Sequence, residues 1–139
     1  MKAANNAQQQ NKKDHYSWIK GRFELEKQIR LFFWSLDYID IRTPLLVLSP
    51  GMEPHIKPLE VKNANGPVFL PTSPEFGMKK LISLGFEKVF QMCASFRDEP
   101  ISPEHHPEFT MLEFYEANIS LEGFQTRIED LFRFLALKL

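Results

Sequence analysis

Two stretches of alternating residues on either side of a proline-rich loop constrain the fold more than any other feature of this sequence. Residues 88–97 and 108–116 divide their side chains into two alternating sets, with the period of two residues that β-strands show. The residues between them, 98–107, include three prolines, which interrupt a strand ladder. Two strands joined by such a loop predict an antiparallel pair.

Three other segments have the apolar spacing of amphipathic helices, and they cover residues 17–36, 73–84 and 120–137. At the start of the second segment, Thr72 and Glu75 have the spacing of a capping box. Ser120 is a suitable N-cap for the third.

Short strands are expected at 38–43, before Pro44, and at 68–70, after the turn signal of Asn65 and Gly66. The order is then helix, strand, loops, helix, strand, strand, helix, which differs from the regular alternation of a parallel βαβ fold. The sequence therefore predicts an α+β fold with an antiparallel sheet flanked by helices.

The composition narrows the class of protein. The 139 residues carry 17 Lys and Arg against 18 Asp and Glu, a formal charge of −1, unlike the basic balance of many nucleic-acid binders. No apolar run is long enough for a membrane span, and the single Cys93 excludes an internal disulfide and a cysteine-based zinc cluster. Residues 1–16 lack a secretory signal and are expected to be a flexible polar tail before one domain, 17–139. A cytoplasmic location fits these features best.

Arg97, at the end of the first long strand, is the most informative polar residue. Its planar fork of donors suits phosphate oxygens, but it can equally pair with Glu99 or Glu113 on the sheet. Phe109 in the second strand either stacks on a nucleotide base or belongs to the core.

The other reactive side chains give weaker indications. His105 and His106 are adjacent in a loop and lack the one-turn spacing of a helical metal pair, so they are interpreted as solvated histidines. Cys93 lies in an apolar strand and is expected to be an inert packed thiol. The chain contains neither a Walker lysine loop nor a GxGxxG segment.

Taken together, several segments resemble one family. Residues 96–115, FRDEPISPEHHPEFTMLEFY, resemble motif 2 of the class II aminoacyl-tRNA synthetases, and residues 22–46 resemble their motif 1. The segment TSPEFGMKKLISLGFEKVFQMCASF between them is similar to the lysine branch of class IIb. Together with the HIKP segment from His55 to Pro58, this sequence most closely resembles the lysyl-tRNA-synthetase-like ligases that modify elongation factor P. The resemblance covers residues 17–139.

Two residues depart from the family's pattern. His106 and Asp98 stand where the family usually has asparagine, and both remain polar. Motif 3, a Gly-rich segment with a second ATP-binding arginine, has no counterpart among the glycines of this chain. The acids that bind Mg²⁺ in the family are likewise expected outside it.

The resemblance implies that a carboxylate of lysine or β-lysine attacks the α-phosphorus of ATP and expels pyrophosphate. Arg97 would be the catalytic residue, because a fixed guanidinium stabilises the charge that accumulates on the α-phosphate. The ATP-binding residues carried over from the family are Arg97, Asp98, Glu99, His106 and Phe109. The substrate-binding residues carried over are Ser73, Glu75, Glu113 and Tyr115.

The expected acceptor is a lysine of elongation factor P. The sixteen residues before the helix 17–36 leave no room for the N-terminal OB-fold of a lysyl-tRNA synthetase. The alternatives are a lysyl-tRNA synthetase acting on tRNA-Lys and a non-catalytic interaction module without motif 3. A homodimer through the helix 17–36 and the strand 38–43 is expected, since motif 1 builds such interfaces in the family.

Overall fold

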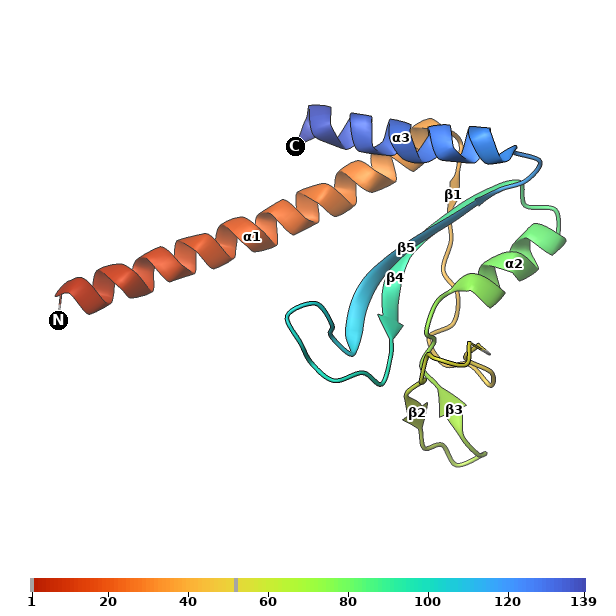
Figure 1. Ribbon diagram of the computed structural model, residues 1–139, viewed down its shortest axis with the longest axis horizontal. Helices are drawn as coiled ribbons and strands as arrows, with labels where there is room; N and C mark the ends of the chain where they lie inside the picture. The colour runs from red at the N-terminus through yellow and green to blue at the C-terminus, as the bar shows by residue number, and fades with distance from the viewer. Residues whose placement is uncertain (1, 52) are drawn as a thin grey trace. The chain divides into compact units, whose positions relative to one another are not determined.

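The computed structural model of the protein describes residues 2–51 and 53–139. The chain divides into two compact units, which are described separately. One comprises residues 37–119, and the other combines the N-terminal helix with residues 120–139. Both are visible in Figure 1, where the two long strands of the first unit are drawn in blue-green and light blue.

The sheet of the 37–119 unit is built on the predicted strand pair. Strand β4 (Lys88–Phe96) pairs antiparallel with β5 (Glu108–Glu116) along its whole length, from Lys88 opposite Glu116 to Phe96 opposite Glu108. Residues 98–107 form the connecting loop. The α+β fold class and the placement of both strands are confirmed.

A third strand makes the sheet mixed rather than purely antiparallel. Strand β1 (Ile39–Asp40) pairs with β4 in the parallel direction, which gives the order β1, β4, β5. The prediction of antiparallel pairing alone was wrong here, because alternation reveals an extended segment but not its direction. The strand is also shorter than the predicted 38–43. The backbone N–H of Ile41 still donates to the carbonyl of Phe90, but the backbone N–H of Thr43 donates to the side-chain oxygen of Gln91. The backbone pairing with β4 therefore ends before Thr43.

A small hairpin precedes the helix of this unit. Strands β2 (Glu60–Val61) and β3 (Val68–Phe69) pair antiparallel around a turn that ends at Gly66. Gly66 has φ = +113°, a backbone conformation that glycine adopts without strain, and it donates its N–H to Asn63. The predicted turn and the short strand after it are confirmed.

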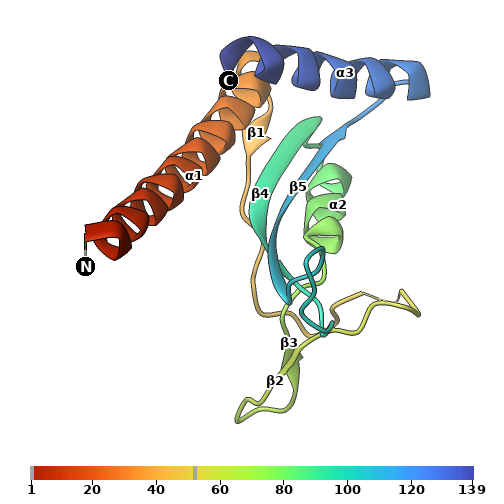
Figure 2. The same ribbon diagram turned by 60° about the vertical axis from the view of Figure 1, so that its left-hand side comes forward.

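Helix α2 (Glu75–Ser83) packs against β4 and β5, as Figures 1 and 2 both show. Its buried Met78 joins a core with Ile41 and Val89. The predicted capping box is wrong, because the hydroxyl of Thr72 donates to the carbonyl of Pro50 instead. The N–H of Glu75 is bonded by the hydroxyl oxygen of Ser73 at 3.2 Å.

The second unit consists of α1 (Lys2–Ser35) and α3 (Leu121–Lys138). Within it, Phe32 and Phe134 pack with ring centroids 5.6 Å apart. Ser120 caps α3 as predicted, accepting a hydrogen bond from Gly123 at 3.1 Å. Among the described residues, no helix has an apolar stretch that would cross a bilayer.

Helix α1 begins much earlier than the predicted start at residue 17. It includes residues 2–16 of the segment that was expected to be a flexible polar tail, and residue 1 lies outside the described residues. That segment contains Ala, Gln and Lys but neither Gly nor Pro, so its composition favours a helix even where no apolar face exists. Its mobility in solution stays a prediction, which amide exchange can test.

Candidate functional site

The predicted site residues of the two long strands lie on one face of the sheet. Directly opposed residues of antiparallel strands project to the same side. The register therefore places four cross-strand pairs on this face, which are Val89–Tyr115, Gln91–Glu113, Cys93–Met111 and Ser95–Phe109. Arg97 follows the last of these positions, directly after β4. The strand alternation alone thus gathers Phe109, Glu113 and Tyr115 on one surface.

Arg97 and Phe109 form the first part of the site. The guanidinium carbon lies 5.0 Å from the centroid of the Phe109 ring, a cation–π distance. The Nε atom of Arg97 is buried and has no hydrogen-bond partner within the described chain. Among the same residues, no ion pair joins Arg97 to Glu99 or Glu113. The structure therefore lacks the Arg–Glu pair that was the alternative to phosphate binding. A buried donor without a partner is costly, and an acceptor from a ligand would relieve that cost.

The other three residues predicted to bind ATP make contacts of their own. Asp98 pairs with Lys57 at 2.5 Å, and a hydrogen bond to Asp98 raises the pKa of that lysine above its usual value. The N–H of Glu99 donates to the carbonyl of Arg97 at 2.9 Å. His106 is exposed, with its Nδ1 atom 3.2 Å from the carbonyl of Glu108. Within the described residues, no side-chain hydrogen bond or ion pair joins these three to the Arg97–Phe109 pair.

The four residues predicted to bind the amino acid come together around Glu113. Burial raises the pKa of the Glu113 carboxyl above its usual value, and the nearby charge of Glu75 acts in the same direction. Hydrogen bonds with Ser73 and Tyr115 oppose this rise only in part. A buried carboxylate with a second acidic side chain nearby forms a site that favours a cation.

Tyr115 belongs to the same cluster. Burial raises its pKa to about 12, and the charges of Glu113 and Glu75 and a hydrogen bond to Glu113 contribute further. The phenol therefore stays protonated and can donate to Glu113. Lys79, one turn after Glu75 on α2, forms an ion pair with it. The charge of Lys79 also acts to lower the pKa of Glu113, although no ion pair joins these two residues among the described ones.

The two parts of the site are neighbours on the same surface. Phe109 and Glu113 are four residues apart on β5, which corresponds to about 13 Å along an extended strand. One end thus offers an arginine on an aromatic ring, and the other offers acids and hydroxyls. This arrangement is suited to a ligand pair with phosphate at one end and an amine at the other.

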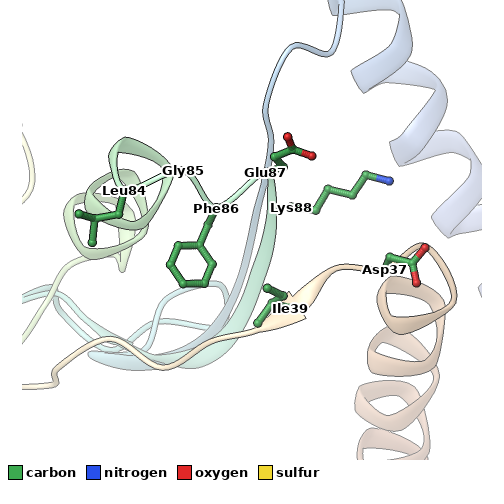
Figure 3. Close-up of a pocket in the computed structure, with 7 residues that line it drawn as sticks. All are labelled: Asp37, Ile39, Leu84, Gly85, Phe86, Glu87 and Lys88. Carbon is green, nitrogen blue, oxygen red and sulfur yellow. The ribbon is translucent and has the colours of Figure 1, made fainter.

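A cavity of about 490 Å³ lies elsewhere in this unit, and Figure 3 shows its lining. Its residues are Asp37, Ile39, Leu84, Gly85, Phe86, Glu87 and Lys88. Lys88 begins β4, whereas Arg97 follows its end, so the cavity is at the opposite end of the strand from Arg97. It includes none of the predicted site residues.

The remaining reactive side chains, Cys93 and His105, are not assigned to the candidate site. Burial raises the pKa of the Cys93 thiol, which fits the predicted inert thiol. His105 is held by Ser102 in the exposed loop. In the described part of the chain, no three His, Cys, Asp or Glu side chains lie close enough to hold a metal ion.

Sequence reasoning missed Gln91, Thr43 and Lys57. Gln91 is only 2% exposed and bonds both the backbone and the hydroxyl of Thr43. The sequence does contain a signal for Gln91, because a glutamine within an apolar strand requires buried hydrogen-bond partners. The partner itself could not be identified, since it lies 48 positions away in the sequence.

Comparison with known proteins agrees with these observations. The family model described as tRNA synthetases class II (D, K and N) matches residues 2–139. Lysine–tRNA ligase of Pseudomonas fluorescens strain Pf0-1 is 39% identical over 121 residues, which are 83% of this chain and 23% of the relative. Lysine–tRNA ligase of Coxiella burnetii strain Dugway 5J108-111 is 39% identical over 120 residues, 85% of this chain and 24% of the relative.

The chain thus spans about a quarter of the length of the curated relatives it matches. The matched segment contains both long strands, helix α2 and the loop between the strands. Since the family model covers nearly every residue, the chain belongs to the class II tRNA synthetases of the D, K and N group.

Proposed function

We propose that this chain carries the part of an ATP-dependent ligase that binds lysine and ATP for formation of lysyl adenylate. One observation carries the proposal. Arg97, with a buried Nε that lacks a partner in the described chain, shares a sheet face with the acidic cluster around Glu113. The family match and the two lysine–tRNA ligases support the choice of substrates.

Arg97 is assigned to the α-phosphate of ATP. A guanidinium donates two parallel hydrogen bonds to phosphate oxygens, and the ring of Phe109 limits the directions in which it can point. A preorganised donor of this kind stabilises the developing negative charge by about 3–4 kcal/mol. Stacking of the adenine on Phe109 is part of the same proposal, as are contacts of the base and ribose with Asp98, Glu99 and His106.

Glu113 and Glu75 are assigned to the ammonium groups of the substrate, with Ser73 and Tyr115 as hydrogen-bonding neighbours. A bound cation would favour the ionised form of Glu113, whose pKa burial raises in its absence. Lysine and β-lysine both carry two amines, so both are candidate substrates. Mg²⁺ accompanies ATP in the family, but the described residues offer no group of three ligands for it. No step is therefore assigned to magnesium here.

Two acceptors are proposed for the activated lysyl group, each on one observation. The relatives bear the name lysine–tRNA ligase, which supports tRNA-Lys. The sequence of residues 96–115, together with the segments around Ser73 and His55, supports elongation factor P. Two separate reactions distinguish the acceptors. Each contains ATP, labelled lysine and only one of the two acceptors. Label on the RNA supports the first acceptor, and label on the protein supports the second.

Substrate binding is tested first, by calorimetric titration of the chain with ATP, L-lysine, β-lysine and L-leucine. The proposal expects ATP and at least one of the two lysines to bind, and leucine, which lacks the side-chain amine, to bind much more weakly. Arg133→Ala serves as a control, because this arginine lies on α3 in exposed ion pairs with Glu129 and Asp130. A chain that binds neither ATP nor lysine would instead be an interaction module.

A further inference from the structure

Helix α2 carries a glycine at a place where the helix itself gives no reason for one. Gly77 lies inside Glu75–Ser83, where glycine is less favourable than alanine. A Cβ atom built on Gly77 would lie 2.5 Å from Cγ2 and 2.8 Å from Cβ of Thr43. Both distances are shorter than real carbon contacts, so only glycine lets α2 approach Thr43 this closely.

Thr43 cannot easily give way, because Gln91 holds it at two points. The side-chain oxygen of Gln91 accepts the backbone N–H of Thr43 at 3.1 Å. The side-chain nitrogen of Gln91 donates to the Thr43 hydroxyl, also at 3.1 Å. Gln91 is 2% exposed, so breaking either bond would leave a buried polar group unpaired.

This contact is adjacent to the proposed lysine site on both sides. Gln91 stands directly opposite Glu113 in the strand register, so the two side chains share a face. Gly77 lies two residues after Glu75 and four after Ser73, within about one helical turn. Ser73, Gly77 and Thr43 also line one small cavity of about 40 Å³.

We propose that Gln91, Thr43 and Gly77 form a clamp that sets the distance between helix α2 and the sheet, and that Gln91 is a positioning residue for the lysine site. The proposal rests on the proposed function. The clamp fixes how far Ser73 and Glu75 reach toward Glu113 and Tyr115. Tyr115 packs on the core of Ile41, Met78 and Val89, so a displaced α2 would disturb it as well. Among the described residues, no side-chain hydrogen bond or ion pair joins the Arg97–Phe109 pair to α2, so this pair should be unaffected.

Gly77→Ala tests the clamp, with Gly21→Ala as its matched control. Gly21 is also helical, but a Cβ built there meets nothing within 4 Å. The clamp predicts that Gly77→Ala weakens L-lysine binding about tenfold or more, while ATP binding and the Gly21→Ala variant stay near the parent. Equal loss of lysine and ATP affinity, or unchanged lysine affinity, would overturn the proposal.

Two further variants separate positioning from simple loss of stability. Adding Thr43→Ser to Gly77→Ala removes the nearest atom, Cγ2, while keeping the hydroxyl that Gln91 bonds, so part of the lysine affinity should return. A double variant no better than Gly77→Ala would count against the clamp. Thr43→Val keeps the methyl group and removes only the acceptor of Gln91. It should also weaken lysine binding selectively, and parent-like lysine binding would contradict the role of Gln91.

The amide resonances of Ser73 and Glu75 provide a readout that does not depend on the ligand. The clamp predicts that both shift in Gly77→Ala and return toward the parent in the Thr43→Ser, Gly77→Ala double variant. If the parent binds no lysine but these shifts occur, the proposed function fails and the clamp stands. If the resonances do not move in Gly77→Ala, the clamp fails whatever the ligand does.

Discussion

The guanidinium of Arg97 lies over the ring of Phe109, with its central carbon 5.0 Å from the ring centroid. The residue also lacks a hydrogen-bond partner at its buried Nε within the described chain. An arginine held by an aromatic ring, without a carboxylate to neutralise it, keeps its charge and donors available for an anion. This relationship supports the proposed role of Arg97 in phosphate binding, because an arginine that pairs with a glutamate on the sheet would have its charge already neutralised.

The first prediction concerns Arg97→Ala. Loss of a charge-assisted contact to phosphate should weaken ATP binding by about 1.5–3 kcal/mol. The free energy of unfolding should fall by only about 1 kcal/mol, since the cation–π contact is the main interaction lost from the folded protein. Calorimetry with ATP and denaturant unfolding measure the two quantities. Unchanged ATP affinity with a large loss of stability would show that Arg97 is structural.

The second prediction concerns Glu113 and pH. Burial raises the folded-state pKa of Glu113 above its ordinary value of 4.5. Its contribution to stability is therefore fully present below pH 4.5 and is lost as the pH rises through the raised pKa. Glu113→Gln should flatten this part of the stability profile and should be no less stable than the parent at neutral pH. Urea unfolding across the acid range measures it.

Glu122 provides a control with the opposite sign. Hydrogen bonds at the start of α3, first from its own backbone N–H, lower the pKa of Glu122. Its contribution is present above the ordinary carboxyl pKa and is lost as the pH falls through the lowered value. Glu122→Gln should therefore remove stability at neutral pH rather than add it. If both variants changed the profile in the same direction, the assignment of a raised pKa to Glu113 would be wrong.

The third prediction tests the cap of α3. Ser120 accepts the N–H of Gly123, and Ser120→Ala should lower the free energy of unfolding by about 1 kcal/mol. Thr126→Ala in the same helix is the control, because that hydroxyl only donates back to the carbonyl of Glu122. It should change stability by less than about 0.5 kcal/mol. Thermal unfolding compares the two, and an equal effect would argue against the cap.

The site face could be predicted because strand alternation is local information. Residues 108–116 carry a period of two, so the alternation itself puts Phe109, Glu113 and Tyr115 on one side of the strand, as the register shows. The role of Arg97 came from a run of matching residues rather than from its own neighbourhood. Its contact with Phe109 depends on the exact strand register, which the sequence leaves undetermined.

Other features escaped prediction because they depend on partners distant in the sequence. The parallel pairing of β1 is set where Ile39 and Asp40 meet Val89 and Phe90, about fifty positions later. Thr72 has capping-box spacing, yet the carbonyl of Pro50 is its partner. The start of α1 was missed because a polar helix has no apolar stripe to reveal it.

The fourth prediction is a homodimer through residues 17–36 and the segment 38–43. Helix α1 exposes large apolar side chains, with Trp18 81%, Phe23 64% and Trp34 48% exposed. Such a surface favours association with a second copy. Sedimentation at tens of micromolar should show a dimer, and replacing Trp18 and Phe23 by serine should shift it toward monomer. A parent chain that sediments as a monomer would contradict the expectation.

The most direct test of the central claim is calorimetric titration with a lysyl sulfamoyl adenosine, which mimics lysyl adenylate without being hydrolysed. The account predicts one ligand bound per chain, with Arg97→Ala and Glu113→Gln each weakening binding about tenfold or more while Arg133→Ala has little effect. Binding that neither site variant alters, or no binding by the folded parent chain, would contradict the claim that this sheet face holds lysine and nucleotide together.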